Sequence, residues 1–236
     1  MDYHETASVV LSEAFLLNEG ATDEYGFTAL PGGIRFHLFP LGISLDDIRI
    51  LPKAELRKIV APIYIRELRA TVDWFSLLAG EIRLSQLQFN NAQIVLILKQ
   101  TKEKTPALTQ LPFEVKDITQ LPIDELQFND TLVMMRVEDP KVLVKLDRMD
   151  LQLVNLRRAL FANLVLPEIY FRQLAETQNI SLGFSSKIWV DANEINISSL
   201  KMKKGSSFVV GNGSVKGRLK QLEMAEAKFN LRTKID

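Results

Sequence analysis

Residues 71–98 read TVDWFSLLAGEIRLSQLQFNNAQIVLIL. The stretch predicts a strand end, one helical turn, and then two strands joined by a tight turn. Its apolar residues stand at offsets of 0, 2, 5 and 7: Ile82, Leu84, Leu87 and Phe89. Strict strand alternation would place them at 0, 2, 4 and 6. The additional residue belongs to the polar pair Ser85-Gln86, which indicates a β-bulge that keeps the apolar residues on one face.

The same spacing recurs six times along the chain. The further copies begin at Ile43, Ile63, Leu121, Val144, Leu164 and Ile195. None of the central pairs contains a hydrophobic residue, although 47% of the chain is hydrophobic. One copy would arise by chance in such a composition, but seven with polar centres would not. The pattern therefore predicts a series of one-sided, bulged strands.

The copies also repeat as groups, which indicates a tandem duplication. The copies at Ile43, Ile63 and Ile82 correspond to those at Leu121, Val144 and Leu164, with shifts of 78, 81 and 82 residues. The tetrapeptide LQFN occurs at 87–90 and again at 126–129. We interpret the chain as an N-terminal helix and loop (1–33), a first repeat unit (34–100), a linker loop (101–120), and a second unit with further strands of the same continuous sheet (121–236).

The predicted fold is mainly β with a few short helices. Asp73 is expected to cap a helical turn that ends before Gly80, and residues 156–162 are expected to form the matching turn of the second unit. Separate strands are predicted at 121–129 and 131–138. The residues alone leave two arrangements open. An ordinary sandwich or helix-covered sheet is favoured by the tendency of apolar faces to find protein partners. A long sheet that curls about its own apolar face and leaves a groove is indicated by the tandem repetition and by the small number of short helices.

Composition and motifs exclude several classes of function. The chain has 29 basic and 29 acidic residues, so no net charge directs it to nucleic acid. Cysteine is absent, and the two histidines, His4 and His37, suggest no ligand set. Acidic pairs such as Asp46-Asp47 occupy the repeated bulge position, where other copies carry Ser-Ser, so we interpret them as structural. We predict neither enzymatic activity nor a metal or other cofactor.

Four segments resemble the AsmA-like family, which includes TamB. VDWFSLLAGEIRLSQLQFNNAQIVLIL (72–98) is similar to the family's N-terminal module, with its strand, short "sLL-G" turn and following strands. LPIDELQFNDTLVMMRV (121–137) resembles the next strand pair, SSLKMKKGSSFVVGNGSVKG (198–217) the family's glycine-containing strands, and PLGISLDDIRI (40–50) the strand before the module. The chain departs from the family in lacking the usual inner-membrane helix and in carrying Asn91-Ala92 in place of Asn-Pro.

The resemblance implies an elongated, curled antiparallel sheet, a β-taco with an apolar groove, built from tandem repeats. It also implies a periplasmic module of the Gram-negative cell envelope, tethered to the inner membrane by a segment absent from this chain. It implies phospholipid as partner, with acyl chains held in an apolar groove and lipid moved between the inner and outer membranes. The alternative is a scaffold without lipid for outer-membrane protein assembly or type II secretion. The residues expected to line the groove are Ile63, Ile65, Leu68, Ile82, Leu84, Leu87, Phe89, Leu96, Leu126, Phe128, Leu146, Met149, Leu166 and Ile169.

Overall fold

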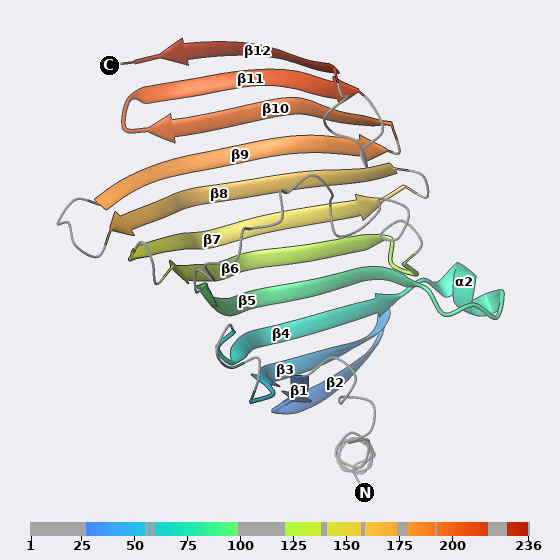
Figure 1. The fold of residues 1–236 in the computed structure, drawn as a ribbon. Helices are drawn as coiled ribbons and strands as arrows, with labels where there is room; N and C mark the ends of the chain where they lie inside the picture. The colour runs from blue at the N-terminus through green and yellow to red at the C-terminus, as the bar shows by residue number, and fades with distance from the viewer. Residues whose placement is uncertain are drawn as a thin grey trace, which may run out of the picture.

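The chain forms one long, curled and unclosed β-sheet (Figure 1). The computed structural model describes residues 27–54, 57, 60–98, 121–137, 141–156, 159–173, 179–191, 193–216 and 226–235. The predicted N-terminal helix and loop (1–33) lie outside these residues up to position 26, and so does the linker at 101–120. Twelve strands belong to the single sheet, and the described residues contain one short helix, α2 (Trp74–Leu78). The predicted mainly β, elongated and curled sheet is therefore confirmed.

The strands follow one another across the sheet almost in chain order. They are β1 (Phe27–Leu30), β2 (Gly33–Leu38), β3 (Leu41–Pro52), β4 (Ile63–Val72), β5 (Leu84–Leu98), β6 (Glu125–Val137), β7 (Val142–Asn155), β8 (Ala159–Gln173), β9 (Asn179–Asp191), β10 (Glu194–Lys204), β11 (Ser207–Lys216) and β12 (Glu226–Lys234). Both β1 and β2 pair with β3, and from β3 to β12 each strand pairs with the next one in sequence.

One pair of neighbours is parallel, and it lies at the boundary between the two predicted units. Strands β3–β5 form an antiparallel meander, β6–β12 form another, and β5 pairs with β6 in parallel. Strands β5 and β6 therefore begin at the same end of the sheet. Parallel strands also require a long connection, because the chain has to return to the starting end of the sheet. The long segment between Leu98 and Glu125 supplies that connection. The duplication itself stays a prediction.

A line of left-handed residues crosses the sheet from β3 to β7. Asp47, Asn91, Asp130 and Arg148 have φ between 50° and 54°, one residue on each of β3, β5, β6 and β7. On β4, Ile65 and Glu67 pair with the residues on either side of Asp47 and of Asn91, and Arg66 lies between them. We call this line the crease. Apart from Arg148, these left-handed residues are Asp and Asn, the residue types that best tolerate this conformation after glycine.

The crease corrects two predictions. The segment at Asn90-Asn91 is not a tight turn between two strands, because β5 continues without interruption from Leu84 to Leu98. Likewise, 121–129 and 131–138 are not separate strands, since β6 runs from Glu125 through the left-handed Asp130 to Val137. Asn-Asn and Asn-Asp are typical of turns because they accept positive φ. A one-residue bulge uses the same property while the strand goes on.

The predicted bulges are largely present; on β6 the bulge is displaced, and β5 has a second irregularity at the crease. The register shifts beside Ser85-Gln86, Pro167-Glu168 and Ser198-Ser199, as predicted. On β5 and β6, however, the crease lies five residues beyond the predicted pairs, at Asn90-Asn91 and Asn129-Asp130. The set Leu87, Phe89, Ala92 and Ile94 then repeats the offsets 0, 2, 5 and 7.

The helical turn α2 is confirmed, and its predicted counterpart is wrong. The Asp73 carboxylate accepts hydrogen bonds from the backbone N–H groups of Phe75 and Ser76, at 3.2 and 3.3 Å. Gly80 follows with φ of 81°, as expected after a helix end. In the second unit, β8 already begins at Ala159, within the predicted turn at 156–162. Its residues Leu160 and Phe161 pair with β9, so strand pairing replaces the helix.

Candidate functional site: the apolar face of the sheet

One side of the sheet is apolar from β3 to β12. Directly paired residues on neighbouring strands point to the same side, so the registers define each face. One row of paired residues is Leu45, Leu68, Phe89, Phe128, Leu151, Leu164, Ser186, Leu200, Gly211 and Leu231. The adjacent row is Ile43, Ala70, Leu87, Leu126, Leu153, Ala162, Ile188, Ile197, Gly213 and Phe229. We call the side that carries these rows the apolar face.

No second described sheet covers the apolar face. All twelve described strands belong to one sheet, and the extensive contacts between described elements join sheet neighbours. The face is most buried near β3–β5, where Ile48, Ile65 and Ala92 form a small cluster with Leu45 and Phe89. It becomes more exposed toward β12, where Phe229 and Leu231 are half exposed. A closed sandwich, the alternative left open by the sequence, is therefore not formed by the described strands.

The structure brings together nearly all of the residues predicted to line a groove. Ile63, Ile65 and Leu68 lie on β4, and the registers place them with the apolar face. The same holds for Leu84, Leu87, Phe89, Leu96, Leu126, Phe128, Leu146, Met149, Leu166 and Ile169. Ile82 is the exception. It precedes β5 and is 79% exposed at the end of the sheet, because β5 begins only at Leu84.

The centre of the apolar face lies at the parallel pair of β5 and β6. The LQFN tetrapeptides at 87–90 and 126–129 pair residue for residue. Phe89 stacks on Phe128 with ring centroids 4.7 Å apart. On the opposite face, Gln88 donates a hydrogen bond to Gln127 at 2.8 Å, and Asn129 donates one to Asn90 at 2.9 Å. Contacts between identical residues therefore stabilise this strand pair on both faces of the sheet.

Some residues of the apolar face were missed in the sequence. Ala92, Ile94, Thr131 and Val133 lie beyond the crease on β5 and β6, in segments that the sequence predicted to be separate strands after a turn. If the Asn90-Asn91 and Asn129-Asp130 pairs are interpreted as bulges, the spacing of 0, 2, 5 and 7 continues to these four residues. Thr131 is fully buried, and its Oγ1 has no hydrogen-bond partner in the described part of the chain. It interrupts an otherwise apolar set.

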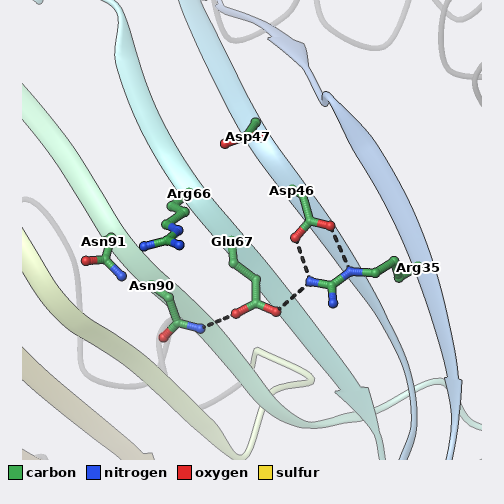
Figure 2. Close-up of a pocket in the computed structure, with 7 residues that line it drawn as sticks. All are labelled: Arg35, Asp46, Asp47, Arg66, Glu67, Asn90 and Asn91. Atoms are coloured by element: carbon green, nitrogen blue, oxygen red, sulfur yellow. Dashed lines mark hydrogen bonds and ion pairs between the residues drawn. The ribbon is translucent and has the colours of Figure 1, made fainter.

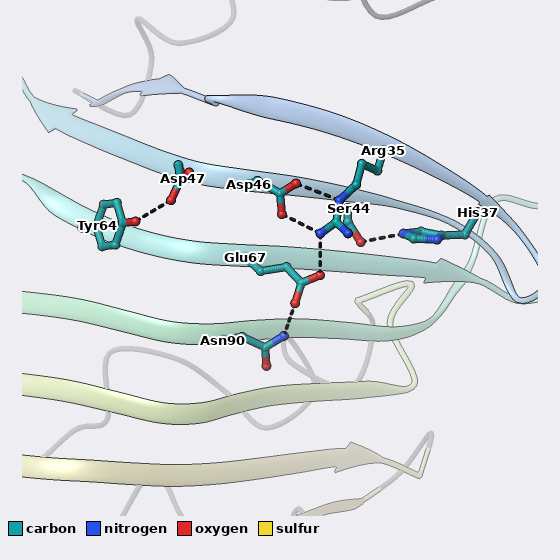
Figure 3. Close-up of polar contacts among 8 residues, drawn as sticks. All are labelled: Arg35, His37, Ser44, Asp46, Asp47, Tyr64, Glu67 and Asn90. Carbon is teal, nitrogen blue, oxygen red and sulfur yellow. Dashed lines mark hydrogen bonds and ion pairs between the residues drawn. The ribbon is translucent and has the colours of Figure 1, made fainter. Parts of the chain in front are cut away.

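The opposite face is held by a network of polar side chains (Figure 3). Arg35 forms a bidentate pair with Asp46, at 2.8 and 2.7 Å, and also contacts Glu67 at 3.1 Å. Asn90 donates a hydrogen bond to the other Glu67 oxygen at 2.9 Å. The hydrogen bond and charge of Asp46 raise the pKa of Arg35. His37 bonds Ser44 at 2.8 Å on this face, as expected from its place between Phe36 and Leu38.

A shallow polar cavity of about 650 Å³ lies over the crease on this same side of the sheet (Figure 2). Its lining residues are Arg35, Asp46, Asp47, Arg66, Glu67, Asn90 and Asn91. The Tyr64 hydroxyl donates a 2.5 Å hydrogen bond to Asp47, which raises the pKa of Tyr64. Two arginines and three carboxylates line the cavity, and the acidic pair Asp46-Asp47 has structural partners in Arg35 and Tyr64. The arrangement offers no apolar ligand a place to bind.

No group of three or more His, Asp or Glu residues is placed to hold a metal ion in the described ranges. Within the same ranges, no helix has both the length and the apolar character needed to cross a bilayer.

Comparison with known proteins adds no relative. No protein-family model matches the sequence, and no curated protein matches it. The resemblance to the AsmA-like family therefore rests on the four sequence segments described above.

Proposed function

We propose that the protein binds phospholipid acyl chains along the apolar face and passes lipid between membranes. The observation that carries the proposal is one apolar surface that continues across strands β3–β12 of a curled, unclosed sheet, with no second described sheet over it. Large exposed apolar surfaces on soluble proteins typically mark sites of interaction with proteins, ligands or membranes. The resemblance to the AsmA-like family supports lipid among these and supports a periplasmic location in this proposal.

The mechanism is passive. An acyl chain buried in a bilayer is shielded from water, and leaving it exposed costs roughly 0.8 kcal/mol for each CH₂ group. A chain that moves onto the apolar face instead exchanges one apolar environment for another. The protein therefore lowers the barrier to transfer without supplying energy, while the head group stays at the edge of the sheet in water.

Leu87 and Leu126 are the residues best suited to test this proposal. They pair directly at the centre of the apolar face and are partly buried. Each lies next to a polar-face residue, Gln88 or Gln127, which allows a matched control on the same strands.

The experiment is native mass spectrometry of the chain purified from a bacterial envelope. We expect bound phospholipid in the wild type, and its loss in the Leu87→Asp/Leu126→Asp variant, because two carboxylates would have to be desolvated beneath an acyl chain. The Gln88→Asp variant places a charge on the opposite face and should keep the lipid. Circular dichroism checks that each variant is folded. Lipid-free wild-type protein that also takes up no fluorescent phospholipid would contradict the proposal.

The edge strand β12 favours a second candidate function, a scaffold that binds protein partners without lipid. In the described part of the chain β12 has β11 as its only neighbour, and all nine of its residues are exposed. An open edge can accept a strand from another protein through backbone hydrogen bonds. Backbone amide exchange distinguishes the two functions: a partner strand would protect β12 amides, whereas lipid would leave them unprotected.

A further inference from the structure

A cluster of exposed apolar side chains projects from one end of the sheet. It consists of Phe39, Trp74, Phe75, Leu78 and Ile82, and we call it the apolar tip. Phe39 is 88% exposed, Phe75 84% and Leu78 79%. Trp74 stacks on Phe39, with ring centroids 6.4 Å apart, so the β2–β3 turn and α2 form one unit. Figure 1 shows α2 protruding beyond the ends of β4 and β5.

We infer that the apolar tip inserts into the surface of a lipid bilayer. The cluster is made of exposed aromatic and aliphatic side chains on an element that protrudes from the sheet. Side chains of these types are the ones that enter the boundary between head groups and acyl chains in interfacial segments. Tryptophan is also the residue type enriched at bilayer interfaces.

Backbone groups at both ends of α2 are hydrogen-bonded within the apolar tip, which lowers the cost of placing them in lipid. Asp73 accepts from the backbone N–H groups of Phe75 and Ser76, and Ala79 donates to the carbonyls of Phe75 and Ser76. Arg83, at the base, is paired with Asp124. Glu81 is exposed beside the cluster, and its charge disfavours anionic lipid. We therefore expect binding to zwitterionic lipid that depends little on salt.

The opposite end of the sheet has a different character. Its β10–β11 turn carries Lys203 and Lys204, and its β6–β7 turn carries Lys141, all exposed. The two ends are thus distinct, and only the α2 end would meet the bilayer. The inference rests on the proposed function in one respect. Docking of the apolar tip would bring one end of the apolar face to the bilayer, where lipid can enter.

The test uses tryptophan fluorescence. The chain has two tryptophans, so Trp189→Phe leaves Trp74 as the sole reporter. With phosphatidylcholine vesicles we expect a blue shift of its emission, quenching by brominated acyl chains, and flotation of the protein with the vesicles. Added in this background, Phe75→Asp/Leu78→Asp should lower the vesicle-bound fraction at least about tenfold. The matched control Ile235→Asp removes a side chain of similar exposure at the opposite end of the sheet and should bind like the parent.

Three outcomes would overturn the inference: a parent protein that does not bind vesicles, an aspartate variant that binds as well as the parent, or a blue shift that depends on protein concentration without vesicles. The last result would indicate self-association through the same residues. If the proposed function is wrong, the protein carries no lipid in native mass spectrometry but still binds to vesicles. Failure of the apolar tip alone would leave the lipid bound in native mass spectrometry.

Discussion

Phe89 and Phe128 stack with their ring planes inclined by only 10°, and each is the third residue of an LQFN tetrapeptide. This contact joins the two meanders at the parallel pair of β5 and β6. Identical residues meet there because parallel, in-register pairing places equivalent positions side by side. The pair therefore tests whether the meanders stabilise each other.

Replacing either phenylalanine by leucine should weaken this junction. A double-mutant cycle of Phe89→Leu and Phe128→Leu should give a coupling energy of about 0.5–1.5 kcal/mol, the usual value for stacked rings. Urea unfolding followed by circular dichroism measures it. The pair Phe128→Leu and Phe184→Leu, which are not register partners, serves as the control and should be additive. A coupling no larger than that of the control would show that the rings are energetically independent.

The left-handed conformation of Asn91 predicts an unusual order of stability among its variants. Asn91→Val should destabilise the protein by about 1–2 kcal/mol, because a β-branched residue resists positive φ. Asn91→Gly should stay within about 1 kcal/mol of the wild type. Gln93→Val, an exposed position of the same strand, is the control and should be nearly neutral. Equal urea midpoints for the valine and glycine variants at position 91 would contradict the bulge.

Two buried hydroxyls on the apolar face should respond with opposite signs. Thr131→Val removes a hydroxyl that has no described partner and should stabilise the protein by about 1 kcal/mol. Ser186 donates a hydrogen bond to the Ser199 carbonyl at 3.1 Å, so Ser186→Ala should destabilise it by about 1 kcal/mol. Thermal unfolding compares the two. Destabilisation by Thr131→Val would indicate that its hydroxyl has a partner.

The cap of α2 predicts a local dependence on pH. A hydrogen bond from the Ser76 hydroxyl, helped by the N–H groups of Phe75 and Ser76, lowers the pKa of Asp73. A lowered folded-state pKa means that the cap stabilises α2 above the ordinary aspartate pKa and is lost as pH falls through the lower, folded value. In the Trp189→Phe background, Trp74 emission should therefore change only below about pH 4.

Asn at position 73 provides the control for this titration. Asparagine caps helices as well as aspartate but does not ionise, so Asp73→Asn should abolish the acid change while keeping the neutral-pH emission. An unchanged acid transition in that variant would assign the titration to another group.

The fold was predictable because the pattern of apolar and polar residues that specifies it repeats at regular intervals. Apolar residues at alternating positions with polar interruptions, as at Leu45 and Ile48, define a one-sided bulged strand wherever it occurs. The position of the bulge was less predictable. Asn90-Asn91 and Asn129-Asp130 carry the residues of a turn, and only the pairing of β5 with β6 over their whole length separates a bulge from a turn. That pairing joins two segments far apart in the chain, so the sequence of neither segment alone predicts it.

The apolar tip and the polar network were not predictable for a related reason. Phe39 and Trp74 come together only when the β2–β3 turn and α2 reach the same end of the sheet. Ile82 was assigned to the apolar face because it fits the spacing, although β5 starts after it. Similarly, Arg35, Glu67 and Asn90 are distant in the chain and meet through strand register.

The parallel pair of β5 and β6 has a consequence for how such a protein can grow. A meander with an odd number of strands ends in the direction in which it began, so it can pair in parallel with a neighbour on each side. Inserting such a meander at that junction would leave every downstream strand with its original orientation and its original side toward water. The molecule could thus be lengthened by whole meanders while all of its apolar residues stay on the same face of the sheet.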